Sequence, residues 1–250
     1  MIDGKEILTL TINRKPIHTH RVDVAIMHSS ACYPTLELWK EKQEGIKSLI
    51  MINPPGHRTI KAMKPEWYTS FAARINTHPL GKKVFKSMGG TKVFRGVRND
   101  PQNAENAIFA CQTMHYARKE RMIDLVTRVR ESQTPMLYFY SDRDKLIDTA
   151  IFHELLAFLG ADQSIVCNIS KEGDILQEAA TDHDWLRVLC AKDGGHYAFK
   201  SCAAILEKEI TKLLAQVYMT DILRPVNHAT DEEKWESLDR VKWTPASSAT

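Results

Sequence analysis

Three side chains in this 250-residue chain could together carry out acyl transfer, and each comes shortly after an apolar run. They are the hydroxyl of Ser29, the carboxylate of Asp144 and the imidazole of His196. A serine becomes a good nucleophile when an adjacent base takes its proton, and histidine is the commonest base. A carboxylate bonded to the second ring nitrogen holds the imidazole in the required tautomer. These residue types therefore predict a nucleophile, a base and an orienting acid.

The elements that must position these groups are predicted to be parallel strands. Residues 22–27, 135–140 and 186–191 form short apolar runs that end sharply, as strands buried on both faces do. In an open parallel sheet, the loops beyond the carboxyl ends of the strands gather along one edge, where such sheets place their sites. We therefore expect the serine, the carboxylate and the histidine to meet at that edge.

The segment around Ser29 has the order of elements that an activated serine requires. The strand over 22–27 leads into a helical pattern from Ser30 to about Lys42, and a further strand is expected over 46–52. Strand, helix and strand within about thirty residues form a βαβ unit with parallel strands. A sharp turn before the helix would expose the hydroxyl and direct the Ser30 N–H at a developing oxyanion.

The remaining pattern is helical between the strands. Helices are expected over 67–76, 79–88, 103–119, 122–130, 149–159 and 198–217, and a strand over 7–12. Residues 164–181 show no clear periodicity. The residues after the last helix are polar, so we expect a disordered tail over 219–250.

Three segments resemble motifs of the α/β-hydrolase superfamily, in the order that this superfamily uses. His28-Ser29-Ser30-Ala31-Cys32 resembles its His-Ser-x-Gly nucleophile elbow, residues 135–144 resemble its acid segment, and residues 193–197 resemble its terminal histidine loop. Residues 49–56 are most similar to an uncharacterised subfamily of hydrolases of unknown function. The resemblance spans about residues 22–215.

The resemblance implies an α/β fold with a mostly parallel sheet, and a serine hydrolase acting on esters or related acyl compounds. Its catalytic residues would be Ser29, Asp144 and His196, with the Ser30 N–H as one oxyanion donor. The core would comprise residues 22–54 and 134–218, and residues 55–133 would form a helical insertion. We expect this insertion to be a lid that selects substrates, with simple packing on the sheet as the alternative.

Two departures from the superfamily pattern favour an alternative interpretation, in which the protein is not an active hydrolase. Met27 and Ala31 stand where the elbow normally has glycine, and only 28 residues precede Ser29, where about four strands are usual. We therefore expect the chain to lack the N-terminal strands and the second oxyanion donor, a loss on the order of a hundredfold in rate. The strand over 7–12 would then cover the exposed flank of the strand over 22–27. The alternative function is an inactive descendant that binds a ligand or a partner.

Each candidate residue also has a purely structural interpretation. Ser29 could be an ordinary helix N-cap, Asp144 could cap the helix that follows it, and His196 could be a buried structural histidine. Asp142 competes with Asp144 for the role of the acid.

Composition excludes several other classes of protein. The net charge of +3 comes from interleaved basic and acidic residues, so no nucleic-acid partner is expected. The five cysteines are spread without a CxxC pair, which favours reduced thiols.

There is no signal-peptide pattern and no apolar run of about 18 residues, so we expect a cytoplasmic protein. His18, His20 and residues 182–184 lack a metal-ligand spacing, so we expect neither metal nor cofactor, but a small-molecule acyl substrate. The oligomeric state is not indicated.

Overall fold

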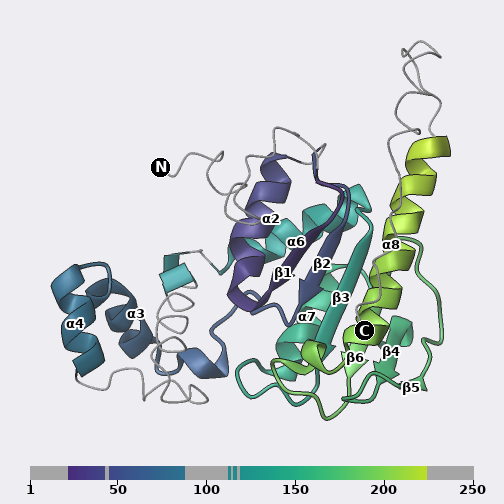
Figure 1. The fold of residues 1–250 in the computed structure, drawn as a ribbon. Coiled ribbons are helices and arrows are strands. Elements are labelled where there is room, and N and C mark those ends of the chain that lie inside the picture. Colours follow the sequence, from purple (N-terminus) through teal and green to yellow (C-terminus); the bar gives the residue numbers. More distant parts are fainter. Residues whose placement is uncertain (1–21, 43–44, 88–111, 114, 117–118, 224–250) are drawn as a thin grey trace, which may run out of the picture. The chain divides into compact units, whose positions relative to one another are not determined.

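A six-stranded sheet lies at the centre of the first of two units into which the chain divides, Met1–Val217 and Tyr218–Thr250. The computed structural model describes residues 22–42, 45–87, 112–113, 115–116 and 119–223 (Figure 1). Among these residues, no helix is both long enough and apolar enough to cross a membrane.

The strands lie in the order β1-β2-β3-β6-β4-β5, and every neighbouring pair is parallel except β4 with β5. Their bounds are Ala25–His28 for β1, Leu49–Ile52 for β2, Met136–Ser141 for β3, Val166–Ile169 for β4, Ile175–Gln177 for β5 and Leu186–Ala191 for β6. The four predicted strands from 22 onward are confirmed as β1, β2, β3 and β6. The predicted α/β fold with a mostly parallel sheet is therefore confirmed.

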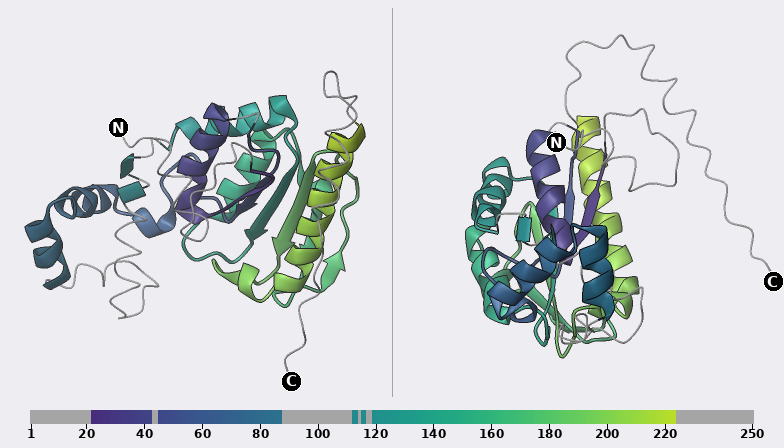
Figure 2. Two further views of the ribbon diagram at one scale, coloured as in Figure 1. Left: turned by 45° about the horizontal axis from the view of Figure 1, so that its top comes forward. Right: turned by 90° about the vertical axis from the view of Figure 1, so that its left-hand side faces the viewer.

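The two faces of the sheet pack against different helices, because successive strand residues point to opposite sides. On β2, Leu49 and Met51 belong to the cluster that contains the buried residues of α2 (Cys32–Glu41), α6 (Arg121–Ser132) and α7 (Thr149–Phe158). Ile50 and Ile52 belong to the cluster of the opposite face, which α8 (Ala203–Leu223) covers. Figures 1 and 2 show this arrangement of helices on either side of the strands.

The helices that face the sheet bury apolar residues at helical spacing. In α2 the buried side chains are Cys32, Tyr33, Leu36 and Trp39, and in α6 they are Met122, Leu125, Val126 and Val129. The insertion contributes α3 (Glu66–Ile75) and α4 (Pro79–Ser87), close to the predicted bounds. Its function as a lid stays a prediction.

Two sequence predictions need correction, and one segment without a prediction contains strands. The helix expected from Ser30 starts as a 3-10 turn, η1 (Ser29–Ala31), before α2 begins. Residues 164–181, which lacked a pattern, contain β4 and β5, because these strands are short and β5 is exposed. The last helix starts at Ala203, after the 3-10 turn η5 (Ala198–Lys200), and continues to Leu223, so residues 219–223 are not part of a disordered tail.

The described residues end with α8 at Leu223. The predicted strand over 7–12, most of the helix over 103–119 and the tail beyond Leu223 lie outside the described residues.

Candidate active site

The carboxyl end of β3 and the loop after β6 bring Asp144 and His196 together. His196 Nδ1 lies 2.6 Å from Asp144 Oδ2, and the other carboxylate oxygen accepts the N–H groups of Leu146 at 2.8 Å and Ile147 at 3.1 Å. The Asp144 side chain is fully buried and that of His196 is 7% exposed. An ionised carboxylate only accepts hydrogen bonds, so Nδ1 of His196 carries the proton and Nε2 is left to accept one.

Ser29 lies at the turn between β1 and α2, where the chain changes direction within one residue. His28 is extended, with φ −124° and ψ 133°, whereas Ser29 has φ 53° in the left-handed region. A non-glycine residue with positive φ is uncommon and costs free energy, so the surrounding packing must impose it. Tyr33 of α2 donates to the Gly56 carbonyl at 2.7 Å, which ties the helix to the loop after β2. The Ser29 turn therefore has the strained form that a nucleophile elbow requires.

His28 connects the Ser29 turn to the histidine loop. Its ring centroid lies 4.8 Å from that of His196, 4.8 Å from Phe199 and 5.5 Å from Tyr197. Burial, followed by the nearby imidazole of His196, lowers the pKa of His28 from 6.5 to about 4. His28 is therefore neutral near pH 7, and the residue adjacent to Ser29 packs directly against His196. Between Ser29 and His196 themselves, both described, there is no hydrogen bond.

Asn53 is a polar residue of this region that the sequence interpretation missed. It follows β2, is fully buried, and donates through Nδ2 to the backbone carbonyl of His196 at 2.8 Å. Its backbone N–H donates to the Phe139 carbonyl at 2.8 Å. An asparagine before Pro54 and Pro55 is typical of a turn, so its type and position carried no signal for this longer-range contact.

Strained backbone is concentrated at the same edge of the sheet. Ser29, Asn53 and Asp193 have φ values of 53°, 43° and 58°, and they follow the carboxyl ends of β1, β2 and β6. The other non-glycine residue with positive φ among those described is Gln133, which ends α6. A left-handed residue is common at a helix end, but three of them at strand ends along the same edge of the sheet point to a functional site.

The two candidate acids occupy different environments. Asp142 Oδ1 accepts the N–H of Asp193 at 2.7 Å, and Asp142 Oδ2 lies 3.5 Å from Lys192 Nζ. Asp144 instead faces His196. Asp142 therefore holds the loop that carries the histidine, and Asp144 contacts the imidazole itself.

The glycines before His196 differ in how tightly they are packed. A Cβ on Gly194 would lie 2.8 Å from Ala198 Cβ, 2.9 Å from Ala191 Cβ and 3.0 Å from the Ala191 carbonyl oxygen. A Cβ on Gly195 would meet no atom within 4 Å. Close packing therefore requires glycine at position 194 but not at position 195.

The residues that replace the usual elbow glycines occupy contrasting positions. Met27 is 1% exposed and packs in the cluster on the α2 side of the sheet, whereas Ala31 is exposed. The Met27 side chain is therefore accommodated in the core. Ser30 is the middle residue of η1, directly after Ser29.

One protein-family model, described as "Alpha/beta hydrolase of unknown function (DUF1057)", matches residues 15–215. This match covers most of the chain. The chain belongs to this α/β-hydrolase family. The comparison with curated proteins gave no match.

Several solved structures are similar to this α/β hydrolase. A hydrolase from Oleispira antarctica, olei00960, is 12% identical, with 78% of this chain and 66% of that chain covered and a TM-score of 0.43. A thermophilic esterase from Thermogutta terrifontis is 13% identical, with 78% and 65% covered and a TM-score of 0.44. The peroxisomal α/β hydrolase Lpx1 of Saccharomyces cerevisiae is 14% identical, with 94% and 63% covered and a TM-score of 0.42. This chain thus spans about two thirds of their length.

The four cysteines that the structure describes in this α/β hydrolase are poor competitors for the role of nucleophile. Cys32, Cys167, Cys190 and Cys202 are buried and free of disulfides. Burial raises the pKa of Cys32, three residues after Ser29, far above its ordinary value, and raises that of Cys190 to about 11. A thiol attacks as its thiolate, so these cysteines are unreactive near neutral pH.

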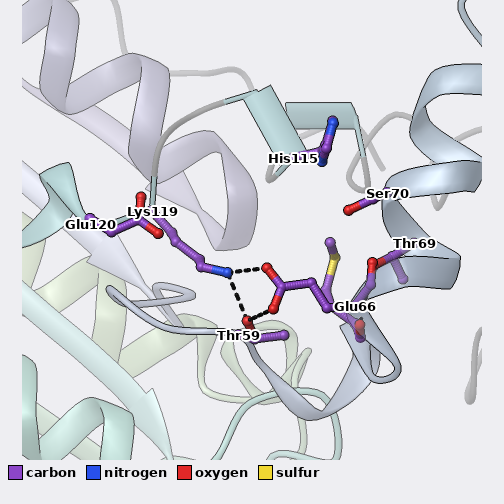
Figure 3. A pocket seen from close by; sticks show the side chains of 8 residues that line it. Thr59, Glu66, Thr69, Ser70, His115, Lys119 and Glu120 are labelled. Carbon is purple, nitrogen blue, oxygen red and sulfur yellow. Dashed lines mark hydrogen bonds and ion pairs between the residues drawn. The ribbon is translucent and has the colours of Figure 1, made fainter.

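The helical insertion contains a cavity of about 210 Å³ of its own (Figure 3). Lys119 Nζ contacts Glu66 and donates to Thr59 Oγ1 at 2.8 Å, and Thr59 donates to Glu66 at 2.9 Å. None of Ser29, Asp144 and His196 lines this cavity. Lys119 is paired with Glu66 and bonded to Thr59 across the cavity. It therefore joins the segment around residue 119 to the segment that contains residues 59 and 66.

A second cavity, of about 390 Å³, lies at the amino ends of β3 and β6, away from the strand ends that carry the candidate site. The Asp182-His183-Asp184 run lines it. Within the described part of the chain, no three potential ligand side chains are grouped to hold a metal ion. His18 and His20 lie outside that part.

Proposed function

We propose that this protein is a serine hydrolase that acts on small acyl esters or related acyl compounds. The observation that carries the proposal is the 2.6 Å contact between Asp144 and a buried His196, whose loop packs on His28, the neighbour of a strained Ser29. A carboxylate, an imidazole and a partly buried serine hydroxyl at the carboxyl ends of strands of one parallel sheet are the parts that acyl transfer requires.

In the proposed mechanism, Ser29 Oγ attacks the carbonyl carbon of the substrate while His196 Nε2 accepts its proton. Asp144 keeps the Nδ1 proton in place and stabilises the imidazolium that forms. The Ser30 N–H donates to the oxyanion. His196 then returns the proton to the leaving group, and a water molecule, deprotonated by the same imidazole, releases the acyl group from Ser29.

The alternative is an inactive descendant that binds a ligand or a partner. The observation that favours it is the missing hydrogen bond between Ser29 and His196. Catalytic hydrogen bonds are often long in structures without substrate, so this observation leaves the hydrolase proposal standing.

Labelling with a fluorophosphonate probe tests the proposal, because an activated serine displaces fluoride from the probe and becomes phosphonylated. The full chain should label at Ser29, as mapped by peptide mass spectrometry. Ser29→Ala should abolish labelling, whereas Ser30→Ala, the matched control, should retain most of it. Folded wild-type protein that stays unlabelled would exclude the hydrolase and favour the binding protein.

A further inference from the structure

Two side-chain donors converge on a single backbone atom, the carbonyl oxygen of His196. Asn53 Nδ2 lies 2.8 Å from it and His28 Nε2 lies 3.3 Å from it. A carbonyl oxygen only accepts hydrogen bonds, so both nitrogens must carry a proton. This requirement sets the orientation of the Asn53 amide and places the ring proton of neutral His28 on Nε2.

Asn53 occupies the position on β2 that corresponds to Ser29 on β1. His28 and Ile52 are register partners in the parallel pair, and each is followed by a residue with positive φ. Asparagine tolerates the left-handed region better than most residues, which suits it to this turn. The two turns therefore leave adjacent strands at the same level, one carrying the hydroxyl and the other carrying the amide.

The imidazole of His196 is held at one ring atom by Asp144, but this contact alone does not determine where the rest of the residue lies. The loop before it contains two glycines, of which Gly195 has free space around it. A second attachment at the carbonyl fixes the backbone of His196 relative to β1 and β2. The ring is then held by Asp144, which follows β3, and the main chain is held by Asn53, which follows β2.

We propose that Asn53 is a positioning residue, which anchors the His196 backbone so that Nε2 is presented to Ser29. This inference rests on the proposed function. Displacing a catalytic group by about 1 Å can cost on the order of a hundredfold in rate. Loss of the Asn53 amide should therefore lower kcat by roughly tenfold to a hundredfold and leave KM nearly unchanged, because Asn53 contacts His196 rather than substrate.

Asn53→Asp is the sharpest variant, because it keeps the shape and the tolerance of positive φ but loses the N–H donor. An ionised carboxylate would face the His196 carbonyl with a second acceptor and repel it. A protonated carboxyl donates, so the ratio of variant to wild-type kcat should rise as the pH falls. Asn53→Gly, which also tolerates positive φ, is the second variant if the aspartate prevents folding.

Asn76 offers a matched control. It is also buried, its Nδ2 donates to the Ala72 carbonyl at 2.7 Å, and its Oδ1, like that of Asn53, has no partner among the described residues. It ends α3 and contacts none of Ser29, Asp144 and His196. Asn76→Asp should therefore affect stability without changing kcat or its pH profile.

The experiment measures p-nitrophenyl acetate hydrolysis and the fluorophosphonate labelling rate of the full chain from pH 5.5 to 9, together with ¹⁵N-histidine NMR. Asn53→Asp should lower kcat, recover relative to wild type at low pH, and shift the His196 ring resonances, whereas Asn76→Asp should do none of these. Equal behaviour of the two variants would overturn the inference. If wild-type protein neither labels nor hydrolyses, the proposed function fails, and the His196 resonances alone decide whether Asn53 positions that residue.

Discussion

The strand-end site and the cavity of the helical insertion both bring ionisable side chains together, but only the strand-end site buries them. The Asp144 side chain is 0% exposed and that of His196 is 7% exposed. In the insertion, Glu66 is 58% exposed and its partner Lys119 is 22% exposed. Positive φ values at non-glycine residues likewise occur at three strand ends, whereas the described residues of the insertion have one only at Gln133, the residue that ends α6.

The two regions therefore differ in the free energy needed to remove their ionisable groups from water. Removing a carboxylate from water is unfavourable unless hydrogen bonds replace the lost solvation, as the contacts of Asp144 do. An exposed ion pair needs no such compensation and contributes little. The strand ends therefore have the character of a chemical site, whereas the Lys119 contacts have the character of a surface connection.

The largest expected effect separates the two acids of the strand-end site. Asp144→Asn should lower kcat by about three to four orders of magnitude, because His196 loses the group that fixes its tautomer. Asp142→Asn should stay within about tenfold of wild type, because the Asp142 side chain contacts the N–H of Asp193 and Lys192 rather than the imidazole. Ester hydrolysis under saturating substrate measures both variants. Equal losses of kcat in the two variants would show that the contact of Asp144 with the imidazole does not determine the rate.

The next effect concerns packing of the histidine loop. Gly194→Ala should destabilise the protein by about 1–3 kcal/mol, because the new methyl group overlaps Ala191 and Ala198. Gly195→Ala should change stability by less than about 0.5 kcal/mol, because its Cβ would enter open space. Urea unfolding of the pair measures the difference. A stable Gly194→Ala would mean that the loop is less closely packed than described.

A smaller effect follows from the low pKa of His28. Above pH 6.5, His28 is neutral in both states and contributes no pH dependence. Below pH 6.5 the unfolded chain protonates this imidazole, whereas the folded protein protonates it only near pH 4. The free energy of unfolding therefore falls as the pH is lowered from 6.5 to about 4, by at most about 1.4 kcal/mol per pH unit.

His28→Gln removes this titration and keeps an N–H donor. The free energy of unfolding of wild type minus that of His28→Gln, measured at pH 7.5, 6 and 5, should therefore decrease as the pH falls. A constant difference would show that His28 is not buried as described.

The smallest effect is expected in the insertion. Lys119→Met should change the free energy of unfolding by less than about 1 kcal/mol, and the change should shrink in high salt, because the pair with Glu66 is exposed. Thermal unfolding at low and high ionic strength measures this. A larger loss of stability that salt does not reduce would show that the Lys119–Glu66 pair is buried, as the Asp144–His196 pair is.

Sequence alone predicted the strands and most helices because their patterns are local. A parallel strand covered on both faces is a continuous apolar run, and a helix on the sheet repeats its apolar residues every three or four positions. This is why β1, β2, β3 and β6 were found near their observed bounds. The short β4 and the exposed β5 were missed because their pairing, rather than their composition, defines them.

The chemical types at the site were also predicted from sequence, since Ser29, Asp144 and His196 each follow such a run. From sequence, Asp144 was predicted as the acid, with Asp142, two residues earlier after the same strand, as a competing candidate. The structure distinguishes them, because only Asp144 reaches the imidazole of His196.

Asn53 marks the limit of what the sequence determined. Its neighbours Pro54 and Pro55 indicate only a turn, and its partner His196 lies 143 positions away. Residue type and periodicity determine which segments become strands and which side chains end them. Which of those side chains touch, and at which atom, depends on strand order and register, and only the tertiary structure decides these.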